Sequence, residues 1–300
     1  LQGTPVTGFL RLLLHLQAML PLAFSQWMGR CLGSANYYLG SRGALVTKAN
    51  LRLCLPELSP REIESFALRS MRHTGMTVLE TPAVWLSDPT RTVGWIGRIE
   101  NEELLDDAIT SDKGTLIVLP HLGNWEMFNV YFATKGHMTA LYHPPRQDWL
   151  KPLMEKVRGD NLVPTNRKGL ATLYRELSEG KVVTVLPDQV PASGDYAPFF
   201  GHQALTDRLV PRMLKKTQAT AIVCIVYRDA GKFNIRFDPV EEDIYADDIA
   251  QSLSGLNYSM EKSIRTQLVQ YQWEYKRFRE RPAGEKKIYK FDGQPESFHQ

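Results

Sequence analysis

The segment that decides the fold reads Leu116-Ile117-Val118-Leu119-Pro120-His121-Leu122-Gly123-Asn124-Trp125-Glu126. Its unbroken apolar run is typical of a strand that is buried on both faces of a parallel sheet. Pro120 has no backbone N–H and therefore ends the strand. His121 then stands directly after the carboxyl end of the strand, at the edge of an open α/β sheet where ligands bind.

His121 and Glu126 can meet only if the chain turns between them. On one regular helix, a separation of five residues would place them about 140° apart, on different faces. Gly123 and Asn124 can form the turn, and Asn124 is a suitable N-cap for a helix that follows. Glu126 then falls in the first helical turn, where the helix dipole favours its ionised form.

A carboxylate held against an imidazole is the equipment of a general base. It fixes the tautomer and stabilises the imidazolium that forms when the free ring nitrogen accepts a proton. The chain has no G-x-S-x-G motif and no cysteine in a comparable turn, so the nucleophile would be a hydroxyl of the acceptor itself. The alternative is that His121 is only a capping or packing residue, which is the commoner role of a lone histidine at the end of a strand.

The rest of the chain predicts an α/β fold with a central, mostly parallel sheet flanked by helices. Short apolar runs predict strands at Thr115–Leu119, Met138–Tyr142, Val182–Leu186 and Ala221–Tyr227, and a hairpin through Asp229-Ala230-Gly231 to Lys232–Phe237. Ser59-Pro60-Arg61-Glu62 predicts a capped helix that continues to about Leu79. Further helices are predicted at Trp125–Thr134, Trp149–Arg158, Leu170–Glu179, Leu209–Lys216 and within Ile249–Phe278.

The N-terminal region, residues 1–45, is predicted to associate with membranes, and residues 46–300 to form the α/β domain. Val6–Leu32 is apolar but is interrupted by charged residues and Pro21, so it makes a poor membrane-spanning helix. Leu1–Pro56 contains basic residues and no Asp or Glu, which favours a helix lying along an anionic bilayer surface. The alternative is a helix packed on the domain.

Composition narrows the class of protein further. The chain has 300 residues, of which 43% are hydrophobic and 23% charged, as in an ordinary globular protein. Its three cysteines are widely spaced and form neither a disulfide framework nor a zinc motif, which fits a reducing compartment. The histidines show no metal-ligand spacing, so no metal is predicted.

The His121 to Glu126 segment resembles the H-x4-D/E motif of the bacterial lipid A biosynthesis acyltransferases, the late lauroyl/myristoyl transferases of the lysophospholipid acyltransferase superfamily. Further segments resemble that family's pattern in order and cover most of the chain: Asn50–Leu58, Arg167-Lys168-Gly169, Leu186-Pro187-Asp188-Gln189, Phe199-Phe200-Gly201, Ala204-Leu205-Thr206 and Gln270–Phe278. Tyr275 stands where the family has histidine, and this departure leaves the identity of the acceptor open.

The resemblance implies transfer of a fatty acyl chain from acyl carrier protein to a hydroxyl of a lipid A precursor. It implies no cofactor beyond this co-substrate, and a location at the cytoplasmic face of the bacterial inner membrane. Two alternatives stay open: the same chemistry on another membrane lipid, such as a glycerophospholipid or an aminolipid, or a lipid-binding protein without activity. Nucleic acid is not an expected partner, because the basic stretch Tyr271–Phe291 has no nucleic-acid-binding motif beside it and suits an acidic carrier or anionic lipid.

The remaining site candidates have plain structural alternatives. Arg167 precedes a helix and could stabilise a developing oxyanion as a third catalytic residue, or it could be a solvated surface arginine. Asp188 and Gln189 follow a predicted strand and could orient Arg167 or bind sugar hydroxyls, or simply form a turn. Trp125 and Phe200 could line an acyl groove with Asn124 nearby, although aromatic residues in such places are as often part of the core.

Overall fold

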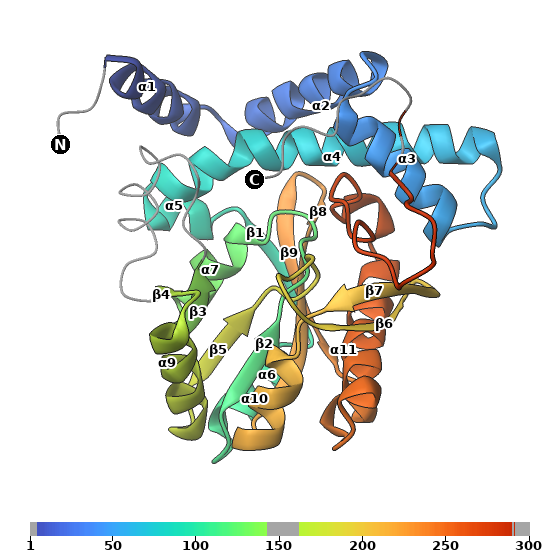
Figure 1. Cartoon of the computed structure of the whole chain (residues 1–300). Coiled ribbons are helices and arrows are strands. Elements are labelled where there is room, and N and C mark those ends of the chain that lie inside the picture. The colour runs from blue at the N-terminus through green and yellow to red at the C-terminus, as the bar shows by residue number, and fades with distance from the viewer. Residues whose placement is uncertain (1–4, 143–161, 290, 292–300) are drawn as a thin grey trace.

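The computed structural model describes residues 5–142, 162–289 and 291, and a seven-stranded sheet forms its centre (Figure 1). The order is β1-β9-β8-β2-β5-β3-β4. The strands of this sheet are β1 (Ile96–Glu100), β2 (Thr115–Val118), β3 (Met138–Tyr142), β4 (Leu162–Pro164), β5 (Val182–Val185), β8 (Thr220–Asp229) and β9 (Lys232–Pro239). Only the β8–β9 pair is antiparallel, so the predicted α/β class with a mostly parallel sheet is confirmed.

Helices cover both faces of the sheet, which explains why β2 is buried at every position. Leu116 and Val118 pack into one core with α9 (Arg167–Ser178), α10 (Leu209–Thr217) and α11 (Ile249–Arg265). Ile117 and Leu119 point the other way, into a second core with α6 (Glu102–Thr110) and α7 (Glu126–Phe132). Successive side chains of a strand alternate between faces, so a strand buried on both sides has no polar face to show.

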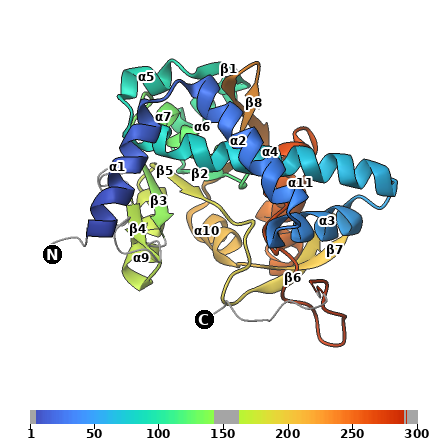
Figure 2. The ribbon, with the colours of Figure 1, turned by 90° about the horizontal axis from the view of Figure 1, so that it is seen from above.

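Four N-terminal helices lie across one edge of the sheet (Figures 1 and 2): α1 (Pro5–Met19), α2 (Leu22–Tyr38), α3 (Arg42–Cys54) and α4 (Pro60–Leu86). The predicted cap of α4 is confirmed, because Ser59 and Glu62 exchange the two hydrogen bonds of a capping box. The helix runs past its predicted end at Leu79, and Pro82 does not interrupt it. Its 27 residues allow it to reach across the sheet edge.

The N-terminal apolar segment forms two helices instead of the single one predicted. They are separated at Pro21 and bent by 119°. Neither helix is long and apolar enough to cross a membrane, and within the described residues only this bent pair would meet the length and composition together. Because α2 packs closely on α4, the alternative of a helix packed on the domain holds for α2.

Several short elements complete the fold. The predicted hairpin between β8 and β9 is confirmed, with Ala230 and Gly231 at positive φ in its two-residue turn. The sequence did not predict β1, β4, the separate hairpin of β6 (Asp195–Phe199) and β7 (His202–Thr206), α5 (Pro89–Val93), or the 3-10 turns Glu242–Tyr245 and Leu268–Gln270. The predicted helix at Trp149–Arg158 lies outside the described residues.

Candidate active site

His121 follows β2 at the edge that α4 covers, and Asp188 fixes both its backbone and its ring. The His121 backbone N–H donates to Asp188 Oδ2 at 2.8 Å, and its Nδ1–H donates to Asp188 Oδ1 at 2.6 Å. Asp188 comes from the loop after β5, the strand that pairs with β2. The sequence predicted that Glu126 would hold the imidazole and that Asp188 would contact Arg167 or substrate. The carboxylate on Nδ1 is instead Asp188.

The Asp188 carboxyl group is 2% exposed and ionised. Its burial works to raise its pKa, but the charge of His121 and the two hydrogen bonds from that residue outweigh the burial, with a smaller contribution from Arg277. The pKa of Asp188 therefore lies below its ordinary value. An ionised Asp188 can only accept hydrogen bonds, so Nδ1 carries a proton and the neutral tautomer of His121 has its lone pair on Nε2.

Glu126 lies in the first turn of α7, as predicted, and is 6% exposed. Its Oε2 accepts hydrogen bonds from Trp85 Nε1 at 3.1 Å and from Asn129 Nδ2 at 3.2 Å. The cap of this helix is different from the prediction. Trp125 occupies the N-cap position without a side-chain hydrogen bond, while the Asn124 side chain turns inward and donates to Glu80.

His121, Glu126 and residues of α4 line one cavity of about 390 Å³. One wall is formed by α4 residues at helical spacing: Thr74, Thr77, Val78, Thr81, Pro82 and Trp85. The opposite wall is formed by the His121 loop and by the segment Gln270–Glu274, and Leu14 of α1 reaches the same space. Thr74 and Trp85 are separated by about 16 Å along the helix axis, so the cavity is long enough to hold part of an extended acyl chain.

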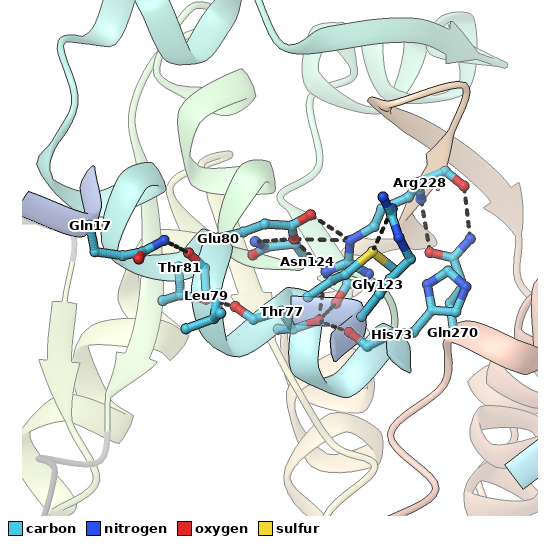
Figure 3. Close-up of polar contacts among 12 residues, drawn as sticks. Gln17, His73, Thr77, Leu79, Glu80, Thr81, Gly123, Asn124, Arg228 and Gln270 are labelled. Carbon is cyan, nitrogen blue, oxygen red and sulfur yellow. Dashed lines mark hydrogen bonds and ion pairs between the residues drawn. The ribbon is translucent and has the colours of Figure 1, made fainter. Parts of the chain in front are cut away.

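A polar network holds Gly123 and Asn124 of the loop between His121 and Glu126 (Figure 3). The Gly123 N–H donates to the Gln270 carbonyl at 2.9 Å, and Thr77 Oγ1 donates to the Gly123 carbonyl at 2.8 Å. Gly123 has φ of 62°, and a Cβ there would lie 1.9 Å from the Val226 carbonyl oxygen. Only glycine can make this turn so close to the end of β8.

An ion pair between Glu80 of α4 and Arg228 of β8 anchors that network. Arg228 Nε lies 2.9 Å from Glu80 Oε1, and Asn124 Nδ2 donates to Glu80 Oε2 at 3.2 Å. Glu80 is fully buried and Arg228 is 8% exposed. Buried charges of this kind must be paired, so the network has one stable arrangement. Neither residue was predicted from the sequence, although Arg228, a charged side chain at the end of an apolar strand, was an available signal.

The other predicted substrate contacts divide into two groups. Trp125 lines the cavity and meets the His121 ring edge to face at 4.7 Å, and Gln189 donates to the side chain of Gln272, which also lines the cavity. Phe200 is 4% exposed and packs against Trp273 in the core. Phe200 is therefore a core residue. It is not among the described residues that line the cavity, so the prediction that it lines the acyl groove is wrong.

Arg167 is the first residue of α9, and it is not among the described residues that line the cavity. It borders a separate depression with Tyr174, Arg175 and Lys216. Both sites lie toward the same edge of the sheet, but β5 and β3 separate β2 from β4, after which α9 starts. The catalytic role of Arg167 stays a prediction.

No group of three or more metal-ligating side chains occurs within the part of the chain that the structure describes. The three cysteines are free thiols, and burial raises the pKa of Cys54 and Cys224. A thiol with a raised pKa is a poor nucleophile, so neither of these two competes with the His121 site.

Comparison with known proteins gives one consistent family. Residues 6–280 match the family model described as bacterial lipid A biosynthesis acyltransferase. The chain is 27% identical over 279 residues to the lipid A biosynthesis lauroyltransferase of Escherichia coli strain K12, covering 90% of each protein. It is 26% identical over 281 residues to the lipid A biosynthesis palmitoleoyltransferase of the same strain, covering 92% of each. Over 257 residues it is 24% identical to the lipid A biosynthesis acyltransferase of Haemophilus influenzae, covering 81% of this chain and 80% of that protein.

Proposed function

Because this chain belongs to the bacterial lipid A biosynthesis acyltransferase family, we propose that it transfers a fatty acyl chain from the thioester of acyl carrier protein to a hydroxyl of a lipid A precursor. The observation that carries the proposal is the His121–Asp188 pair beside a largely apolar cavity. The cavity suits a hydrocarbon chain, since each buried methylene contributes about 0.8 kcal/mol.

His121 is the general base in this proposal. Its Nε2 takes the proton of the acceptor hydroxyl while Asp188 stabilises the imidazolium through Nδ1–H. The hydroxyl oxygen forms a bond to the thioester carbonyl carbon and gives a tetrahedral oxyanion. When the C–S bond breaks, the thiolate of the carrier leaves and takes the proton from His121. The ester forms without a covalent acyl-enzyme.

Glu126 has a separate role from Asp188 in this arrangement. Trp85 and Asn129 hold its carboxyl group at the far end of the cavity wall from Thr74. We propose that Glu126 adds negative charge beside the imidazolium, in place of the tautomer-fixing role that the sequence predicted for it.

The membrane surface is the proposed working place, at the cytoplasmic face of the inner membrane. Phe9, Leu12 and Leu16 of α1 are 59%, 55% and 51% exposed, and Arg11 lies among them. Leu14 of the same helix lines the cavity. A lipid substrate held at the surface by α1 would therefore have a short path to His121, which supports an interfacial position for α1.

The test is acyl transfer in vitro from acyl carrier protein to a defined lipid A precursor, with mass spectrometry of the product. The wild-type chain is expected to add one acyl group, and His121→Ala is expected to lower turnover by about 10² to 10⁴. A folded His121→Ala protein with near-wild-type turnover contradicts the mechanism. A wild-type protein that leaves the glycolipid unchanged contradicts the function.

A further inference from the structure

The cavity contains one more carboxyl group, which the mechanism does not use. Glu274 lies in the segment after the 3-10 turn Leu268–Gln270 and reaches the same cavity as His121. Its carboxyl group lies against the hydroxyl of Thr74 on α4, while its Oε2 atom is buried and has no hydrogen-bond partner among the described residues. A buried polar atom without a partner is unfavourable, because it has lost its hydrogen bonds to water without gaining others. Such an atom in a cavity is explained most simply by a ligand that supplies the missing hydrogen bond.

The neighbouring Tyr275 does not take this role, because it is not among the described residues that line the cavity. Tyr275 Oη accepts a hydrogen bond from the Val190 backbone N–H at 2.9 Å and so faces the loop after β5. Glu274 is therefore the residue of the pair whose side chain faces the cavity.

The two ends of the cavity differ in the polar groups that they leave unpaired. At the polar end, formed by Thr74, Gln272 and Glu274, the Oε2 atom of Glu274 has no hydrogen-bond partner among the described residues. Val78, Pro82 and Trp85 follow along α4 toward the other end, where the Glu126 carboxylate already accepts hydrogen bonds from Trp85 and Asn129. The Gly123 turn of the His121 loop faces α4 between these ends, since Thr77 bonds to Gly123. An acyl chain fits along the apolar residues of α4, and the polar end is left for the hydroxyl-bearing head of the acceptor.

The polar end is also directly connected to the catalytic loop. The Gln272 backbone N–H donates to the His121 carbonyl at 3.0 Å, so Glu274 is two residues from a group that fixes the position of His121. Burial raises the pKa of the Glu274 carboxyl, and Thr74 and the nearby His121 oppose this rise only in part. Ionised or neutral, the carboxyl group keeps an oxygen that can accept a hydrogen bond from a hydroxyl.

We propose that Glu274 is the acceptor-binding residue of this site. Its unpartnered Oε2 accepts a hydrogen bond from a hydroxyl of the glycolipid acceptor other than the one that is acylated. This contact fixes the acceptor so that the nucleophilic hydroxyl lies at His121 Nε2. The inference depends on the proposed function, because it assigns the acceptor end of the same cavity.

Steady-state kinetics with each substrate varied in turn test this assignment. We expect Glu274→Ala to raise KM for the glycolipid acceptor by about tenfold or more, since truncation leaves a hydroxyl of the bound acceptor without its hydrogen-bond partner. KM for the acyl carrier protein thioester should stay within about twofold. Glu274→Gln keeps an accepting oxygen at the same place, so its acceptor KM should stay within about threefold of wild type. Glu280→Ala, at an exposed position of the same segment, is the matched control and should change neither constant.

Several results would overturn the assignment. An unchanged acceptor KM in Glu274→Ala removes the proposed contact, and an equal rise of both KM values indicates a general structural defect. A fall in kcat at constant KM would place Glu274 in the chemical step, and a Glu274→Gln variant as impaired as Glu274→Ala would indicate recognition of a positive charge. Glu274→Met keeps the volume of the side chain and gives the same measurement should Glu274→Ala not fold. A wild-type chain that never acylates the glycolipid contradicts the function itself, which separates the two failures.

Discussion

Asp188 is the residue on which the geometry of His121, the proposed catalytic base, depends. One carboxylate takes the backbone N–H and the ring Nδ1–H of His121 at once, so the imidazole cannot rotate without losing a charge-assisted hydrogen bond. Arg277, which is 2% exposed, adds positive charge nearby and donates to Thr206 Oγ1 at 2.9 Å. Arg277 belongs to the basic stretch Tyr271–Phe291, for which the sequence predicted contact with an acidic carrier or anionic lipid, whereas its burial makes it part of the support of the site.

The first prediction concerns the tautomer of His121. Asp188→Asn keeps the shape of the side chain but presents an amide where the carboxylate was, and it no longer stabilises an imidazolium. Turnover should fall by about 10² to 10⁴. Asp106→Asn, on the exposed surface of α6, is the matched control and should stay within about twofold. Equal activity of the two variants in the acyl-transfer assay would mean that Asp188 is not needed.

The second prediction concerns the buried imidazole of His73 on α4. Its Nδ1 is buried without a hydrogen-bond partner among the described residues. Burial, followed by the charges of Arg228, Arg69 and Arg30, lowers the pKa of His73 to about 3. The unfolded chain binds a proton below about pH 6.5 and the folded chain does not, so the free energy of unfolding must fall as pH drops from about 6.5 toward 3.

Urea denaturation at pH 7.5 and pH 5.5 measures this effect. The wild type should lose about 1 kcal/mol more than His73→Gln between the two pH values, because glutamine has no proton to gain. The comparison between the two proteins removes the contribution of other titrating groups. Identical losses in both would show that His73 is protonated in the folded state at pH 5.5.

At the scale of the elements, α4 connects the N-terminal helices to the catalytic edge. One side of it meets α2, where Gly29 and Gly33 of α2 lie against Gly75 and neighbouring backbone atoms of α4. Another side supplies the cavity wall and Glu80. Because α4 makes both contacts, a displacement of α2 should also change the position of the His121 loop.

The third prediction tests the crossing of α2 and α4. A Cβ at Gly33 would lie 2.1 Å from the Met71 carbonyl oxygen, so the two helices would have to separate. Gly33→Ala should lower the free energy of unfolding by about 1–3 kcal/mol. Gly8→Ala in α1 meets no atom within 4 Å and should be neutral or slightly stabilising. Thermal unfolding of the two variants checks this, and similar midpoints for both would contradict the close crossing.

At the scale of the whole molecule, the helices that cover the sheet edge also carry exposed apolar side chains. Phe24 and Trp27 of α2 are exposed, as are several apolar residues of α1. The substrate cavity opens among these same helices, since Leu14 of α1 is one of its walls. The cavity beside His121 thus lies under helices with exposed apolar side chains, and this arrangement supports the proposal that a membrane lipid is the substrate.

The fourth prediction concerns this surface. A double variant, Leu12→Glu with Leu16→Glu, should reduce cosedimentation with vesicles of phosphatidylethanolamine and phosphatidylglycerol by about tenfold or more. It removes apolar side chains that would enter the bilayer, and it adds negative charges that the anionic phosphatidylglycerol repels. Tyr258→Glu changes an exposed aromatic residue on α11, away from α1 in Figure 1, and serves as the control. Equal vesicle binding by both variants would show that α1 does not contact the bilayer.

The sequence by itself determined the elements that depend on neighbouring residues. The apolar run before Pro120, the capping box at Ser59 and the turn at Ala230-Gly231 predicted β2, the start of α4 and the β8–β9 hairpin, and all three are present. It also placed His121 at the sheet edge and Glu126 in the first turn of α7. These features follow from local backbone preference and hydrophobic period, which adjacent residues encode.

Only the tertiary structure decided which groups meet. Asp188 reaches His121 across 67 residues because β5 pairs with β2, and Glu274 reaches the cavity because the C-terminal segment returns beside the His121 loop. For the same reason the Asn124 side chain, which was predicted to cap α7, instead donates a hydrogen bond to Glu80. The order of strands and the burial of charges depend on how the whole chain packs, so no local pattern around His121 could show that its carboxylate partner lies after β5 and not in α7.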